Sequence, residues 1–128
     1  MASGGAAGST LRYLVSGLAQ RLLIPEAGAV VAFPAGTLVV NVTGSLLIGL
    51  VAGLADSRAL LGPDARLLLA TGVLGGYTTF SAFSLETLLL LRSGQFGTAL
   101  ATVGLQLLLG VAAAYAGFAL ALAAGRPA

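Results

Sequence analysis

The chain has 128 residues, of which 58% are hydrophobic and 8% are charged. A soluble domain carries about 25% charged residues, because it has to present a polar surface to water. Cysteine and histidine are absent, which excludes disulfides, thiol chemistry and the usual transition-metal ligands. The basic residues are scattered arginines rather than a clustered basic face, so nucleic acid is not expected as a partner. The composition therefore indicates an integral membrane protein surrounded by lipid.

The pattern of charges predicts an all-α fold of four membrane-spanning helices in one transmembrane domain, residues 1–128. Crossing ~30 Å of hydrocarbon takes about 20 helical residues. Long uncharged stretches alternate with short charged gaps, and Pro25 and Gly62-Pro63 predict turns in two of those gaps. The N-terminal segment lacks the basic start of a signal peptide, so it is interpreted as a retained first span. The predicted spans are 4–24, 30–55, 66–92 and 96–123.

The arginines in the predicted loops give almost no preference for one orientation in the membrane. Arg58, Arg66 and Arg126 lie on one side of a four-span protein, and Arg21 and Arg92 lie on the other. Since the side with more positive charge normally faces the cytoplasm, a count of three against two is nearly neutral. Two interpretations stay open: a single orientation, or dual topology with two opposed copies paired about an axis in the membrane plane.

Small residues recur four positions apart in three of the predicted spans. Lipid gives helices no hydrophobic reason to associate, so close backbone approach has to hold them together. We therefore expect a tightly packed bundle that forms an oligomer. The pairs are Gly4 with Gly8, Gly49 with Gly53, and Gly72 with Gly76.

The middle of the third predicted span contains a sequence that weakens an α-helix. Two adjacent glycines are followed closely by β-branched residues in the segment 75–79, Gly-Gly-Tyr-Thr-Thr. A break at membrane depth leaves backbone groups without partners, which is tolerated beside protein, water or an ion. Broken helices direct carbonyl oxygens at cations and half-helix N-termini at anions. The alternative is an intact helix whose glycines let a neighbouring helix approach.

Polar side chains form a stripe on the second predicted span. Thr37, Asn41, Gly44 and Ser45 share one helical face. A buried asparagine amide offers two donors and needs partners for them. The stripe is interpreted either as interhelical hydrogen bonding or as part of a polar pathway.

Phe80 and Phe83 follow the predicted break and alternate with hydroxyl side chains. Such rings usually pack, but the positive edge of an aromatic ring can also face an anion. Glu86 lies on the same side, and an acid inside a span is a candidate functional residue. Arg12, inside the first span, either pairs with Glu86 or caps carbonyls freed by the break.

Three of the four predicted spans resemble the Fluc (CrcB-type) family of fluoride channels. The matching segments are GGAAGSTLRY at 4–13, GTLVVNVTGS at 36–45 and GVLGGYTTFSAFSLET at 72–87. This resemblance implies an antiparallel, dual-topology homodimer of four-helix subunits in membrane lipid, with two fluoride pathways. It also implies a third helix broken in mid-membrane and a structural sodium ion at the dimer interface.

Residue roles follow from the same resemblance. Backbone carbonyls of Gly75 and Thr78 would hold the sodium ion, Asn41 would donate to fluoride, and Phe80 and Phe83 would line the pore. Arg12 would lie in the vestibule or serve the structure. Two positions in the fourth span depart from the family pattern of a Tyr and then a Ser. The remaining residues expected along the polar route are Thr37, Thr79, Ser81, Ser84, Glu86 and, at the two departing positions, Thr102 and Gln106.

The implied function is passive fluoride efflux that protects a prokaryotic cell from fluoride across its inner membrane. No enzyme activity is expected. One alternative is a small dual-topology, proton-coupled multidrug exporter, although such proteins carry an essential Glu in the first span, where this chain has Arg12. The other is a non-transporting subunit of a membrane complex.

Overall fold

The computed structural model describes residues 1–25, 31–58 and 61–125, and within these ranges it contains helices and no strand. Pro63 begins its helix directly after Gly62, as the predicted turn requires. The helices in chain order are α1 (Ala2–Leu23), α2 (Ala35–Arg58), α3 (Pro63–Arg66), the π-helix η1 (Leu67–Leu74), α4 (Gly75–Tyr77), α5 (Phe80–Arg92) and α6 (Phe96–Ala124).

Three helical segments in the described residues are long and apolar enough to cross a membrane: Ala35–Asp56, Pro63–Arg92 and Phe96–Ala124. They correspond to the predicted second, third and fourth spans. The second helix begins at Ala35, and the start predicted at residue 30 lies outside the described residues. The helix α1 has 22 residues but is not among these three, so its role as a first span stays a prediction.

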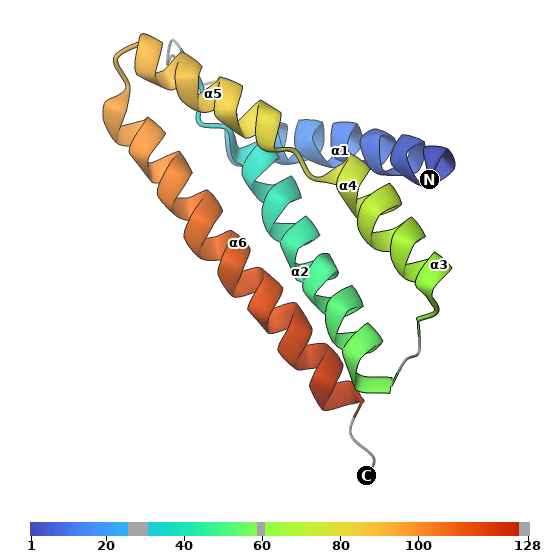
Figure 1. Ribbon diagram of the computed structural model, residues 1–128. Coiled ribbons are helices and arrows are strands. Elements are labelled where there is room, and N and C mark those ends of the chain that lie inside the picture. Colours follow the sequence, from blue (N-terminus) through green and yellow to red (C-terminus); the bar gives the residue numbers. More distant parts are fainter. Residues whose placement is uncertain (26–30, 59–60, 126–128) are drawn as a thin grey trace.

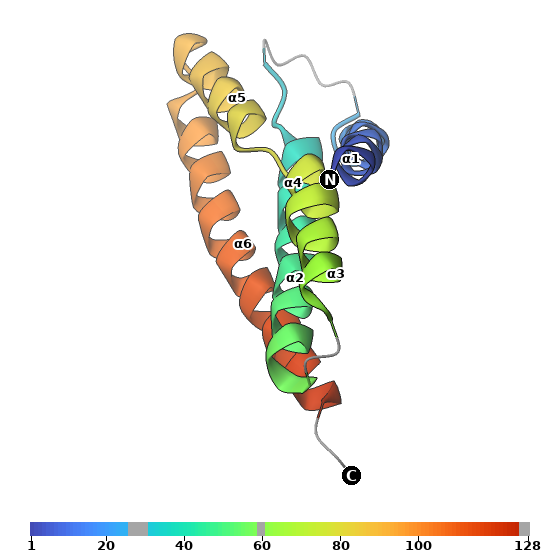
Figure 2. The same ribbon diagram turned by 45° about the vertical axis from the view of Figure 1, so that its right-hand side comes forward.

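The long helices α2 and α6 lie side by side along most of their length (Figures 1 and 2). The helices α3, η1 and α4 form one continuous run on the other side of α2. After α4 the chain changes direction, and α5 lies against the first half of α6. The helix α1 crosses the bundle steeply, so that Figure 2 shows it nearly end-on. It contacts α2, η1 and α4, and thereby reaches the centre of the third segment.

Glycines allow the backbones of neighbouring helices to touch, as the small-residue spacing predicts. A side chain on Gly49 of α2 would collide with the carbonyl of Ala114 on α6. In the same way, Gly8 of α1 lies directly against the carbonyl of Val73 in η1. Such approach maximises van der Waals contact, which drives helix association in lipid.

Much of the outer surface is apolar. Leu100, Leu108 and Tyr115 on α6 expose about three-quarters of their area, and many leucines on the other helices are exposed as well. A soluble monomer rarely presents continuous apolar surface of this extent. Together with the three apolar helices, this surface identifies a membrane protein.

Candidate ion pathway

The third helical segment is interrupted at two threonines. Thr78 has φ −80° and ψ 156°, and Thr79 has φ −150° and ψ 116°, so both are extended. Within the segment 75–79, where the sequence predicted a weakened helix, only the two threonines are extended, because Gly75 and Gly76 are helical in α4. The physical reason is packing: Gly76 lies against the backbone of Gly5 on α1, so its lack of a side chain serves helix contact. The residues that adopt the extended conformation are Thr78 and Thr79, whose β-branched side chains favour it.

The interruption removes the helical hydrogen-bond donors of several backbone carbonyls, among them those of Gly75 and Thr78. The N–H of Thr79 donates to Asn41 Oδ1 at 2.9 Å, and the N–H of Ala82 donates to Thr79 Oγ1 at 3.2 Å. In a continuous helix these two N–H groups would donate to the carbonyls of Gly75 and Thr78. The two carbonyls predicted to hold a cation are therefore among those that lose their helical donors.

Asn41 of α2 bridges the interruption to α6. Its Nδ2 donates to the carbonyl of Thr79 and to Gln106 Oε1, both at 3.1 Å, while its Oδ1 accepts from the Thr79 N–H. Because the Thr79 backbone has fixed donor and acceptor positions, the orientation of the Asn41 amide is determined. Both amide hydrogens are thus used within the protein. In this arrangement Asn41 donates to an ion only by giving up one of these bonds.

Three buried side-chain polar atoms in the described part of the chain have no hydrogen-bond partner. They are Thr102 Oγ1, Gln106 Nε2 and Glu86 Oε2. Thr102 is fully buried and lies one helical turn before Gln106, so both residues point from the same face of α6. Unpartnered buried polar atoms are rare in native proteins, and each calls for an explanation. All three belong to residues that the resemblance places on the fluoride route.

Phe80 and Phe83 form a ring pair directly after the interruption. Their centroids are 5.6 Å apart and their planes are inclined by 55°. Phe80 is 78% exposed, so it projects from the first turn of α5 away from the rest of this chain. Ser84 Oγ donates to the carbonyl of Phe80 at 2.9 Å, so its hydroxyl hydrogen is used within its own helix.

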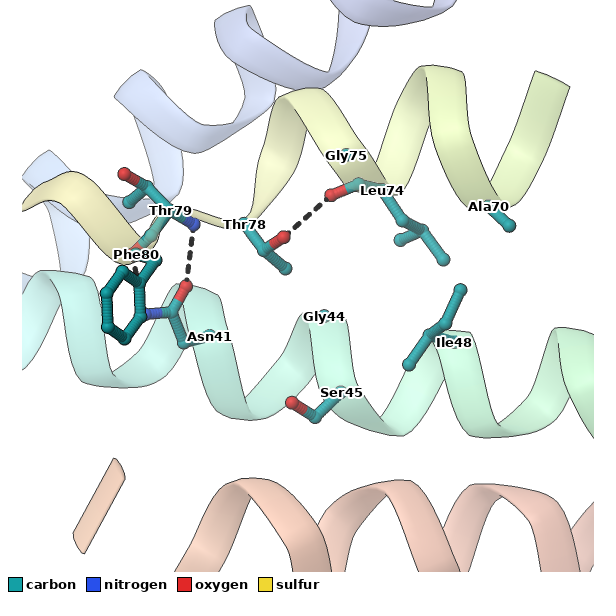
Figure 3. Close-up of a pocket in the computed structure, with 10 residues that line it drawn as sticks. All are labelled: Asn41, Gly44, Ser45, Ile48, Ala70, Leu74, Gly75, Thr78, Thr79 and Phe80. Atoms are coloured by element: carbon teal, nitrogen blue, oxygen red, sulfur yellow. Dashed lines mark hydrogen bonds between the residues drawn. The ribbon is translucent and has the colours of Figure 1, made fainter. Parts of the chain in front are cut away.

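A first cavity of about 350 Å³ lies between α2 and the interrupted segment (Figure 3). Figure 3 shows the Asn41 amide facing the Thr79 backbone, with the Phe80 ring beside it and Gly44 opposite Thr78. The residues that line this cavity are Asn41, Gly44, Ser45, Ile48, Ala70, Leu74, Gly75, Thr78, Thr79 and Phe80.

A second cavity, of about 780 Å³, lies between α1, α2 and α5. It combines charged and hydroxyl side chains from three helices, and Thr37 Oγ1 donates to Glu86 Oε1 there at 2.7 Å. Arg12 and Glu86 both line it, yet no ion pair joins them in the described residues. Thr79 lines both cavities, so both adjoin the interruption. The predicted residues found around the second cavity are Arg12, Thr37, Thr79, Ser81 and Glu86.

Sequence reasoning missed several residues at these sites. Ser9 and Ser16 line the second cavity, and their spacing of three and four residues from Arg12 would have placed them on its helical face. Tyr77 and Thr43 join α4 to α2 by a hydrogen bond of 2.8 Å. That pair carries no signal in the sequence, because Thr43 lies off the polar stripe of the second span.

Comparison with known proteins places these residues in a family. Residues 1–118 match the family model described as "CrcB-like protein, Camphor Resistance (CrcB)". The chain is 51% identical over 118 residues to "Fluoride-specific ion channel FluC" of Rhizobium meliloti, covering 92% of this chain and 90% of that protein. It is 45% identical over 120 residues to proteins of the same name from Methylobacillus flagellatus and Maridesulfovibrio salexigens, covering 94% of this chain and 90% of each.

Proposed function

The chain belongs to the CrcB-like protein family, and we propose that it forms a fluoride-selective channel for passive fluoride efflux. The proposal is supported by similar proteins that carry that name and are matched over nine-tenths of their length. The expected location is the inner membrane of a prokaryotic cell, where the channel would protect against fluoride. No step of this function requires catalysis.

The observation that carries the proposal is the pair of unpartnered donors on α6. Fluoride is small and strongly hydrated, so it crosses a membrane only where hydrogen-bond donors replace its lost water. The Thr102 hydroxyl and the Gln106 amide are buried, lie one turn apart and have no acceptor in the described chain. We assign them as donors to fluoride. They would pass the ion without holding it, because neutral donors bind an anion more weakly than a fixed positive charge.

Asn41 has two proposed roles along this route. It orients Gln106, because Asn41 Nδ2 donates a hydrogen bond to Gln106 Oε1 and the Nε2 group of the same amide has no partner in the described residues. It also donates to the passing ion itself when fluoride displaces one of its two acceptors. The exchange is balanced in number, since one hydrogen bond replaces another.

Phe80 and Phe83 are proposed to present positive ring edges to fluoride while keeping water out. Phe80 projects from its own chain, which suits a place against a second copy. The second cavity would be the vestibule, where Arg12 attracts anions from solution. The polar residues proposed to line the path between vestibule and rings are Thr37, Thr79, Ser81, Ser84 and Glu86.

A structural sodium ion is proposed to bind two of the carbonyls freed at the interruption. Hard cations bind oxygen ligands, and unwound backbone carbonyls hold sodium in membrane proteins. Gly75 and Thr78 each offer a carbonyl oxygen that has lost its helical donor. Two copies in an antiparallel, dual-topology homodimer would offer four such oxygens and create two fluoride pathways. The ion would supply positive charge that joins the two interruptions and stabilises the dimer.

Reconstituted liposomes test the proposal directly. Vesicles loaded with fluoride are diluted into fluoride-free buffer, and efflux is followed with a fluoride electrode while valinomycin balances charge. We expect fluoride efflux and no efflux from matched chloride-loaded vesicles. Proton-coupled exchange of an organic cation would instead identify a multidrug exporter. The absence of transport for every solute tested would favour a non-transporting subunit and refute the proposal.

A further inference from the structure

We propose that Tyr77 is a positioning residue for the ion pathway, and that its hydroxyl group, held by Thr43, sets the register of the interruption. The inference rests on the proposed fluoride function. It concerns a residue that touches neither cavity nor ion pathway directly. Its evidence is a hydrogen-bond chain from α4 to the α2 backbone.

The hydroxyl groups of Tyr77 and Thr43 are joined by a hydrogen bond of 2.8 Å, in which either oxygen can be the donor. The Thr43 hydroxyl also lies within hydrogen-bond distance of the carbonyls of Val39, at 2.7 Å, and Val40, at 3.2 Å. When its single hydrogen goes to one of these carbonyls, its oxygen accepts from the Tyr77 hydroxyl. The ring of Tyr77 is 7% exposed, so water does not readily replace this partner. The α4 helix is thus joined to α2 by a buried, directional bond at its last residue.

This bond and the Asn41 contacts hold the same short segment from two sides. Asn41 and Thr43 are two residues apart on α2, so their side chains leave the helix about 200° apart around its axis. Gly44 lies between them and faces the Thr78 methyl group directly. The interrupted segment therefore lies against α2 at Gly44, with Asn41 on one flank and Thr43 on the other.

The two contacts also fix the direction of the segment. Asn41 binds the backbone of Thr79, and Thr43 binds Tyr77, so the segment runs antiparallel to α2. Loss of the Tyr77 hydroxyl leaves the ring in place but frees α4 to turn or slide. Thr79 would then move relative to Asn41, and Gln106, which Asn41 orients, would move with it. The hydroxyl thereby controls donors that it does not touch.

The test compares Tyr77→Phe with Tyr115→Phe in reconstituted dimers. Tyr115 loses the same hydroxyl from a ring that is 75% exposed, and it has no hydrogen-bond partner in the described chain. Fluoride efflux per folded dimer is measured together with the reversal potential between fluoride and chloride. We expect Tyr77→Phe to lower efflux by about fivefold, which is the change in an equilibrium constant that the loss of one hydrogen bond typically causes. We also expect its reversal potential to move towards zero, and Tyr115→Phe to match the wild type in both measurements.

Further variants separate positioning from general stability. Thr43→Val should reproduce the Tyr77→Phe phenotype, Thr43→Ser should restore wild-type behaviour, and the double variant of Tyr77→Phe with Thr43→Val should be no slower than the slower single variant. A Tyr77→Phe protein with wild-type efflux and reversal potential would overturn the inference, even if its thermal stability fell. Additive losses in the double variant would overturn it as well. If the wild-type protein shows no fluoride efflux, the proposed function on which the inference rests is refuted instead.

Discussion

Replacement of Asn41 by aspartate is the most informative single change at the interruption. The side chain keeps its size and its acceptor for the Thr79 N–H, but a carboxylate oxygen replaces the Nδ2 group that donates two hydrogen bonds. Each lost bond costs about 1 kcal/mol, and the Thr79 carbonyl left unpaired costs about 1–3 kcal/mol more. The Gln106 amide can turn over and donate to the new carboxylate, which limits the structural loss but removes its free donor from the pathway.

The electrostatic effect acts on the passing fluoride ion itself and adds to the structural one. A carboxylate about 4 Å from a fluoride ion repels it by about 4 kcal/mol at an effective dielectric constant of 20, which corresponds to roughly a thousandfold loss. Asn41→Leu provides the comparison, since it loses all three hydrogen bonds but adds no charge. If the number of lost hydrogen bonds decides the rate, Asn41→Leu should conduct fluoride more slowly than Asn41→Asp. If the added negative charge decides it, Asn41→Asp should be the slower variant.

We expect fluoride efflux, normalised to folded protein in liposomes, to fall in the order wild type, Asn41→Leu, Asn41→Asp. Size-exclusion profiles and thermal melts in detergent establish that both variants remain folded. If Asn41→Asp conducts fluoride as fast as Asn41→Leu or faster, no anion passes near this amide, and the assignment of the pathway is wrong.

Three other changes have defined outcomes. Thr102→Val should raise the melting temperature, because it removes a buried hydroxyl without a partner, and should lower fluoride efflux at least tenfold; a rise in both would show that the hydroxyl does not serve the ion. Phe80→Ile should lower efflux at least tenfold, because isoleucine keeps an apolar side chain but has no ring edge; unchanged efflux would exclude a role for the ring edge. Gly44→Ala should destabilise by about 1–3 kcal/mol, because the added methyl collides with Thr78, whereas Gly97→Ala, which meets nothing within 4 Å, should not; equal melts would contradict the packing at this glycine.

The sequence was sufficient for the class of protein, the turn at Gly62-Pro63 and the general position of the second to fourth spans. These features depend on composition and on short-range pattern. Lipid requires about 20 apolar residues per crossing, and proline is tolerated in the first turn of a helix but not in its interior. The motif around Phe80 was sufficient for the family, which the comparisons then confirmed. The stripe through Asn41 also predicted correctly that this amide needs partners.

The partners themselves were decided by the tertiary structure. The sequence indicated a weak point within residues 75–79, and the structure decides where in that segment the helix is interrupted: α1 packs against Gly76, which is helical, and the extended residues are Thr78 and Thr79. Likewise, only the folded chain brings Gln106 to Asn41, across 65 positions of sequence, and leaves the other end of that amide free. A residue's own preference is local and can be read along the chain, whereas the partner of a buried polar atom depends on which helix lies next to it.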